Sequence, residues 1–132
     1  IPRLLDMGVE PFMMASSLEL IIAQRLVRKI CDQCRVSLTS QPTKFFPKKT
    51  TLYKGKGCNN CGNTGFRGRT AIFEFIQIEG EMQDLILKHP STQEITDLAR
   101  KSGSHSLFED GLEKVKNGIT TIEELLRVAI PQ

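Results

Sequence analysis

Four cysteines are the residues of this chain whose type and spacing could do chemistry. They form two Cys-x-x-Cys pairs, Cys31 with Cys34 and Cys58 with Cys61, and no other cysteine occurs in the 132 residues. Each pair can offer two thiolates from one tight turn, and two facing turns supply the four-sulfur tetrahedron of a structural Zn²⁺ site. The loop between the pairs is a little longer than in the common zinc pattern, which changes only the loop. We therefore predict a zinc knuckle with these four cysteines as ligands.

Other interpretations of the cysteines stay open. A redox pair needs one Cys-x-x-Cys at a helix start within a βαβ unit, and that context is absent. Two disulfides would suit a small secreted domain, but no segment resembles a signal peptide. Four thiolates could also hold iron, as in a rubredoxin-like electron carrier, because geometry alone does not separate the two metals. A closed four-sulfur site has no free coordination position, so we predict a structural role in a reducing compartment such as the cytoplasm.

Composition places the chain among ordinary globular proteins. It is 39% hydrophobic and 25% charged, and its length fits one domain, or one with a small satellite. No run of about 18 apolar residues occurs, so we expect no direct membrane insertion. The sequence has no phosphate-binding loop and no catalytic triad or carboxylate pair, so we expect neither an active site nor a small-molecule substrate.

Positive charge is concentrated around the cysteines. Residues 25–69 carry eleven Lys or Arg side chains and one acid, Asp32, although the whole chain is only +3. Cations near a thiolate cluster stabilise its negative charge, and we favour that role for Arg67 and Arg69 over contact with a partner. The alternative function is a nucleic-acid-binding zinc ribbon that uses this basic block. The block has few aromatic residues for stacking and no known nucleic-acid motif, which argues against it.

The elements that must position the cysteines are predicted from periodicity and capping signals. Apolar residues at three- and four-residue spacing predict a helix over about 10–29, which would lead directly into Cys31. Residues 35–50 are polar and contain two prolines, so we expect a surface excursion there. Residues 70–78 are β-branched and aromatic, which predicts a strand covered on both faces.

Short helices should follow from residue 81 onward. A first is expected over 81–89, and three more begin at Ser-x-x-Glu or Thr-x-x-Glu capping boxes, which start at Ser91, Ser106 and Thr121. The predicted fold is α+β and mainly helical, with a tetracysteine zinc knuckle, a small β element and a C-terminal helical bundle. We expect a helical segment at 1–30, a zinc-binding subdomain at 31–69, and a strand plus helical subdomain at 70–132.

Seven segments occur in an order typical of one protein family: residues 3–12, 15–18, 23–28, the first cysteine pair, 65–74, 106–112 and 118–127. Together they resemble the C-terminal part of bacterial secretion ATPases, the hexameric motors of type II secretion and type IV pilus assembly. Ala71 departs from the pattern, since glycine is common at that position. The tetracysteine region is similar to the secretion and pilus-extension branch of the family rather than to its retraction branch.

The resemblance implies a C-terminal zinc-binding accessory domain of a hexameric ATPase that powers type II secretion or type IV pilus assembly. Its partners would be neighbouring ATPase subunits and an inner-membrane platform protein, at the cytoplasmic face of the inner membrane. The motifs for ATP and Mg²⁺ would lie upstream of Ile1, so we expect this chain alone neither to bind nor to hydrolyse ATP. Only the four cysteines are carried over as site residues.

Overall fold

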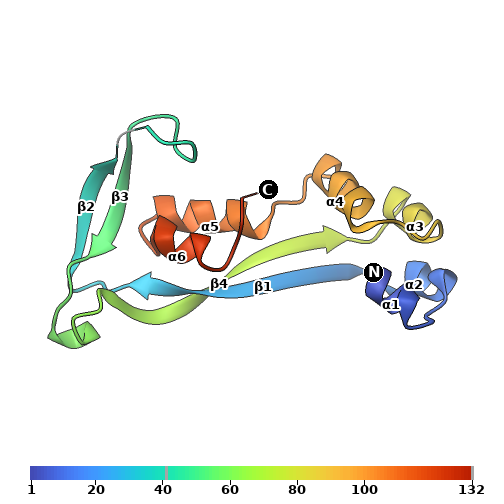
Figure 1. The fold of residues 1–132 in the computed structure, drawn as a ribbon, viewed down its shortest axis with the longest axis horizontal. Helices are drawn as coiled ribbons and strands as arrows, with labels where there is room; N and C mark the ends of the chain where they lie inside the picture. The colour runs from blue at the N-terminus through green and yellow to red at the C-terminus, as the bar shows by residue number, and fades with distance from the viewer. Residues whose placement is uncertain (41, 132) are drawn as a thin grey trace. The chain divides into compact units, whose positions relative to one another are not determined.

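Helices lie in the first and last parts of the chain and the strands lie between them, and this segregation confirms an α+β fold (Figure 1). The computed structural model describes residues 1–40 and 42–131. The helices are α1 (Pro2–Asp6), α2 (Pro11–Ser17), α3 (Glu81–Ile86), α4 (Thr92–Lys101), α5 (Leu107–Lys116) and α6 (Ile122–Leu126), with a short 3₁₀ helix η1 (Asn59–Cys61). The strands are β1 (Leu20–Ile30), β2 (Arg35–Ser40), β3 (Thr50–Gly55) and β4 (Phe66–Gln77). β1 pairs with β4, and β2 pairs with β3 in an antiparallel hairpin.

Two compact units make up the chain, and each is built from two separate segments. Unit 1 contains Ile1–Ala23 and Glu74–His105, and unit 2 contains Gln24–Phe73 and Ser106–Gln132. The unit boundaries therefore fall inside β1 and β4. The subdomain boundaries expected at residues 30 and 69 are placed by the extent of the cysteine region and not by these two units. They stay a prediction.

The predicted helix over 10–29 is wrong after its second turn. Helix α2 ends at Ser17, and the chain continues as the eleven-residue strand β1. The Ser16 hydroxyl donates to the carbonyl oxygen of Phe12 at 2.9 Å, a local bond of the kind that weakens a helix, and Leu18 is already extended. β1 is rich in branched residues, and its pairing with β4 supplies backbone partners that a helix would otherwise provide. Tertiary pairing overrides the helical spacing.

The expected surface excursion over 35–50 is also wrong in part. Its first six residues form β2, which pairs in register with β3 from Arg35 opposite Gly55 to Ser40 opposite Thr50. Phe46 is only 3% exposed and belongs to the core of unit 2. The segment therefore contains a paired strand and returns one aromatic ring to the core, while most of its described residues are exposed, as expected.

An apolar cluster of strand, loop and helix residues forms the core of unit 1. Its buried members are Met14, Ala15, Ile78, Met82, Ile86, Ile95 and Ala99. The capping box at the start of α4 is confirmed, because Ser91 Oγ accepts from the backbone of Glu94 and the Glu94 carboxylate accepts from the backbone of Ser91. This reciprocal bonding fixes where α4 begins.

A second apolar cluster forms the core of unit 2. Its buried members are Val27, Phe46, Ile72, Phe108, Val115, Leu125 and Ala129. The four helices predicted after residue 80 are present, but α3 and α4 belong to unit 1 and α5 and α6 to unit 2. A single C-terminal bundle and a mainly helical fold are therefore not confirmed, and the two longest elements are strands.

Strand β4 confirms the strand expected over 70–78 and begins four residues earlier. It is less covered than expected, because Ile72 is fully buried whereas Phe75 is 50% exposed. Across residues 1–40 and 42–131, no helix combines the length and apolar composition that crossing a bilayer requires.

Candidate metal centre

The structure brings the four predicted cysteines together. Their Sγ atoms all lie within 4.8 Å of one another, and they are the only group of three or more His, Cys, Asp or Glu residues in the described chain that could hold a metal ion. The Sγ–Sγ distance is 3.9 Å between Cys31 and Cys58, 3.9 Å between Cys34 and Cys61, and 3.7 Å between Cys58 and Cys61. All four are free thiols, so neither disulfide pairing is present.

Each cysteine turn is placed by the end of a strand. Cys31 follows the last residue of β1 and Cys34 precedes β2, while Cys58 follows β3 and Cys61 closes η1 just before β4. The two turns are tied by backbone bonds: Cys31 N–H donates to the Gly65 carbonyl at 2.9 Å, and Lys56 N–H donates to the Cys34 carbonyl at 3.0 Å. Both sheets thus converge on the cysteine cluster.

Glycine is required where the backbones flanking the second turn touch. A Cβ added at Gly55 would lie 2.0 Å from the Gly65 carbonyl oxygen, and one added at Gly65 would lie 2.6 Å from the Gly55 carbonyl oxygen. No side chain fits between backbones this close. The glycine-rich stretch therefore has a steric role in closing the cysteine cluster.

Backbone amides and one side-chain amide point at the sulfurs. Cys61 Sγ accepts from the N–H groups of Cys58 and Gly65, each at 3.3 Å, and Asn60 Nδ2 donates to Cys31 Sγ at 3.7 Å. Burial raises the pKa of Cys61, but these two backbone donors outweigh burial and lower it to about 6. The neighbouring donors therefore favour the thiolate, the form that binds metal.

The four thiols cannot all ionise without a cation among them. Burial and the adjacent sulfurs raise the pKa of Cys34 to about 11, while the pKa of Cys61 falls. Four sulfurs at about 2.3 Å from a tetrahedral Zn²⁺ would be about 3.8 Å apart, close to the separations found here. The donor set fits a divalent ion in a closed site, and tetrahedral thiolate coordination suits zinc or iron.

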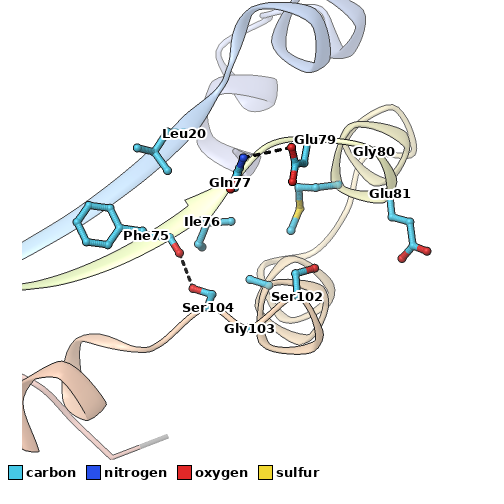
Figure 2. A pocket seen from close by; sticks show the side chains of 12 residues that line it. Leu20, Phe75, Ile76, Gln77, Glu79, Gly80, Glu81, Ser102, Gly103 and Ser104 are labelled. Carbon is cyan, nitrogen blue, oxygen red and sulfur yellow. Dashed lines mark hydrogen bonds between the residues drawn. The ribbon is translucent and has the colours of Figure 1, made fainter. Parts of the chain in front are cut away.

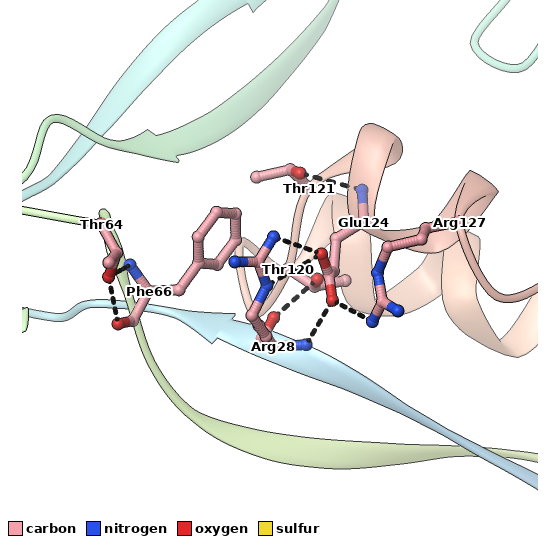
Figure 3. Close-up of polar contacts among 7 residues, drawn as sticks. All are labelled: Arg28, Thr64, Phe66, Thr120, Thr121, Glu124 and Arg127. Carbon is pink, nitrogen blue, oxygen red and sulfur yellow. Dashed lines mark hydrogen bonds and ion pairs between the residues drawn. The ribbon is translucent and has the colours of Figure 1, made fainter.

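A buried carboxylate bonded to the strand that leads into Cys31 was not predicted as a site residue. Glu124 is 2% exposed and binds two arginines: Arg28 Nη2 donates to its Oε2 at 2.8 Å and Arg127 Nη2 donates to its Oε1 at 2.7 Å (Figure 3). Arg28 also donates through its backbone N–H and Nε. Burial raises the pKa of Glu124, but the bonds from Arg127 and Arg28 outweigh it and lower the pKa to about 2. The carboxylate is ionised at neutral pH.

This network joins the segment around α6 to the strand that leads into the first cysteine turn. Thr120 Oγ1 donates to the Arg28 carbonyl at 2.8 Å, and Ile30 N–H donates to the Ile119 carbonyl at 2.8 Å. The Arg28 guanidinium lies over the Phe66 ring, 4.4 Å from its centroid, so β4 is attached at the same place. Sequence spacing gives no hint of these contacts, since Arg28 and Glu124 are 96 positions apart.

Arg67 and Arg69 are both exposed, and neither side chain forms a hydrogen bond or ion pair with another described residue that would fix its role. Arg69 lines two surface pockets with Arg28, whereas Arg67 lines neither. The predicted preference for charge neutralisation at the metal therefore stays a prediction for both.

Unit 1 has a separate surface pocket of about 580 Å³, bordered by strand β4 and helices α3 and α4 (Figure 2). Three of its polar side chains are engaged: Ser104 Oγ donates to the Phe75 carbonyl at 2.5 Å, and Gln77 Nε2 donates to Glu79 at 3.1 Å. Its lining contains no His, Cys or Lys. The chemistry of the described residues is therefore concentrated at the cysteines of unit 2.

Comparison with known proteins gives consistent matches. Residues 1–127 match the model of a family described as type II/IV secretion system protein. The chain is 41% identical to the type IV pilus assembly ATPase PilB of Thermus thermophilus, over 96% of this chain and 15% of that relative. It is 41% identical to the type II secretion system protein E of Pseudomonas aeruginosa and 39% identical to the type II secretion system ATPase E of Vibrio cholerae, over 97% of this chain and 26% of each relative. The chain thus spans about a quarter or less of the length of these relatives.

Proposed function

Because this chain belongs to the type II/IV secretion system protein family, we propose that it is a zinc-binding accessory domain of an ATPase that powers type II secretion or type IV pilus assembly. Zn²⁺ would be held by Cys31, Cys34, Cys58 and Cys61 in a structural site. The ATP and Mg²⁺ sites would lie in the part of the longer relatives that this chain does not cover. The protein would work in the cytoplasm, at the inner membrane through its partners.

The observation that carries the zinc proposal is the close approach of four free sulfurs. Their resolved separations of 3.7 to 3.9 Å match what a tetrahedral Zn²⁺ would impose, and amide donors already favour thiolate at Cys61. When bound, the ion supplies a cross-link between two turns that are far apart in sequence. A structural ion contributes its binding free energy directly to folding, because the site does not exist in the unfolded chain.

The accessory role follows from where the cross-link is placed. β1 and β4 end at the cysteine turns, and the Glu124 network holds the same strands against the segment around α6. A fixed metal centre would therefore keep unit 2 rigid. We propose that this rigid unit contacts neighbouring ATPase subunits or an inner-membrane platform protein.

The nucleic-acid alternative finds little support in the basic block. Each of its aromatic rings is engaged: Arg28 lies over Phe66, Arg35 over Tyr53 and Lys44 over Phe45, while Phe46 is buried. Single-stranded nucleic acids are bound chiefly by stacking bases on free ring faces together with basic side chains. A cation over one face of each of these three rings leaves less ring surface for such stacking.

Metal analysis of the purified protein tests the proposal. We expect one zinc per chain, no visible absorption, and four thiols that react with a thiol reagent only after a chelator removes the ion. A coloured protein that contains iron would instead support the electron-carrier alternative. Fewer than four titratable thiols in the denatured protein would indicate disulfides and overturn the zinc site.

A further inference from the structure

Three arginines of unit 2 line one hollow on its surface. A surface pocket of about 560 Å³ is lined by Leu26, Arg28, Arg69 and Arg127. A second pocket of about 550 Å³ shares Arg28 and Arg69 and is also lined by residues of the segment 64–68. Strand β1, strand β4 and the residue after α6 thus contribute one guanidinium each to the same surface.

Positive charge at this surface exceeds the negative charge available to it. Glu124 is the carboxylate that pairs with Arg28 and Arg127, and Arg69 forms no ion pair within residues 1–40 and 42–131. Arg28 binds Glu124 through Nε and Nη2, and Arg127 binds it through Nη2. A guanidinium has five N–H donors, so each arginine keeps donors for a further ligand.

The arginines are held in place before any ligand arrives. Arg28 is fixed at its face by Phe66 and at its edge by Glu124, and its side chain is still 47% exposed (Figure 3). Arg127 is fixed by the same carboxylate and is 57% exposed. Ordering a long side chain in advance removes part of the entropy cost of binding.

We propose that Arg28, Arg69 and Arg127 form a docking site for carboxylate side chains of an acidic segment of a partner protein. Planar guanidinium groups suit carboxylates, and Glu124 already accepts two N–H groups of Arg28 at Oε2 and one N–H group of Arg127 at Oε1. An acidic protein segment fits better than a nucleic acid, because Phe66, the ring bordering the pocket, already has Arg28 over its face. The inference rests on the proposed function only in that the accessory domain contacts other proteins.

The test is a binding titration of the zinc-loaded protein with a hexaglutamate peptide at low ionic strength, followed by the NMR signals of the arginine Nε–H groups. Inorganic pyrophosphate and a six-nucleotide oligo(dT) are the comparison ligands. Arg69→Ala removes one guanidinium from the pocket. Arg67→Ala is the matched control, because it removes the same charge from the same strand outside both pockets.

We expect hexaglutamate to shift the signals of Arg28, Arg69 and Arg127. Arg69→Ala should weaken its binding about tenfold, as loss of a charge-assisted hydrogen bond does, and Arg67→Ala by less than about twofold. Equal weakening in both variants, tighter binding of either comparison ligand, or no binding of hexaglutamate would overturn the inference. Zinc content is measured on the same samples. If the protein contains zinc but does not bind the peptide, only the docking site is refuted. If the purified protein contains no metal, the proposed zinc site is refuted.

Discussion

The two units are stabilised by different kinds of interaction. The buried residues of the unit 1 cluster are all apolar. Unit 2 has an apolar cluster of similar size, and it also contains the four described polar or charged residues that are buried, namely Ser106, Thr120, Thr121 and Glu124, together with the cysteines. Apolar burial responds little to pH or chelators. Metal-binding thiolates depend on both, and a buried carboxylate depends on pH. We therefore expect that a chelator or a low pH destabilises unit 2 and leaves the stability of unit 1 nearly unchanged.

Loss of the metal should produce the largest difference in amide-exchange protection between the two units. Cys58→Ser, or addition of a chelator, should remove amide-exchange protection from residues 31–66 and leave that of α3 and α4 unchanged. Structural zinc in small sites contributes on the order of 10 kcal/mol to folding, so the expected effect is large. Hydrogen exchange read by mass spectrometry measures both units in one sample. Restoring zinc to the chelated protein is the control, and equal loss of protection in both units would contradict the comparison.

Removing the buried charge of unit 2 should have the next largest effect. Glu124→Gln leaves Arg28 and Arg127 without their carboxylate. Because the side chains of both arginines are about half exposed and stay solvated, we expect a cost of about 1.5 to 3 kcal/mol, the range for hydrogen bonds to a charged group. Urea unfolding followed by NMR signals from α5 would report it. The adjacent exposed residue supplies the control, since Glu123→Gln should change the free energy of unfolding by less than about 0.5 kcal/mol. Similar losses in the two variants would show that the Glu124 network is not stabilising.

Acid should weaken unit 2 through the same carboxylate. The pKa of Glu124 is about 2 in the folded protein against an ordinary value of 4.5, so its contribution is full above about pH 5 and is lost as the pH falls towards 2. Because Arg28 and Arg127 are about half exposed and solvent screens the pair, we expect a contribution of about 1 to 3 kcal/mol at neutral pH. Because acid also protonates the thiols, the quantity to measure is the difference in unfolding free energy between the wild type and Glu124→Gln at each pH. That difference should shrink below pH 5, and a constant difference down to pH 2 would refute the assignment.

The smallest predicted effect belongs to unit 1. Ser91→Ala removes the hydroxyl that caps α4 and should cost about 1 kcal/mol, as N-cap replacements usually do. Exchange protection of α4 should fall while that of α5 stays constant. Ser91→Asn, which can also cap, should restore most of the loss. A change confined to unit 2 would contradict the division of the chain into two units.

Local signals predicted the parts of the molecule that local interactions build. The cysteine pairs lie on tight turns, and the Ser91 and Ser106 boxes open α4 and α5 with both reciprocal bonds. Thr121 also caps its helix, but the carboxylate of Glu124 does not return to it as a capping box would. That carboxylate bonds to arginines instead, and one of them lies 96 positions away. A capping pattern cannot reveal a partner that only the tertiary fold brings near.

Strand β1 shows why the rest could not be predicted. Its apolar residues fit a helical period, and its cations fit a helix end, so local preference pointed to a helix. The strand forms because β4, more than thirty positions away, offers it a pairing edge. The content of branched residues, Ile21, Ile22, Val27 and Ile30, was the available signal for a strand. The same reasoning applies to β2, whose partner lies across the hairpin.

The contact between Gly55 and Gly65 has a consequence for recognising such centres in other sequences. One glycine stands three positions before Cys58 and the other four positions after Cys61, and neither tolerates even a methyl group at its present distance. A four-sulfur site of this kind thus also requires glycine at two positions that contribute no metal ligand. A sequence pattern can require glycine at these two positions as well as the four cysteines. Such a pattern should exclude sequences in which two Cys-x-x-Cys pairs occur by chance and their backbones cannot approach closely enough to bind one ion.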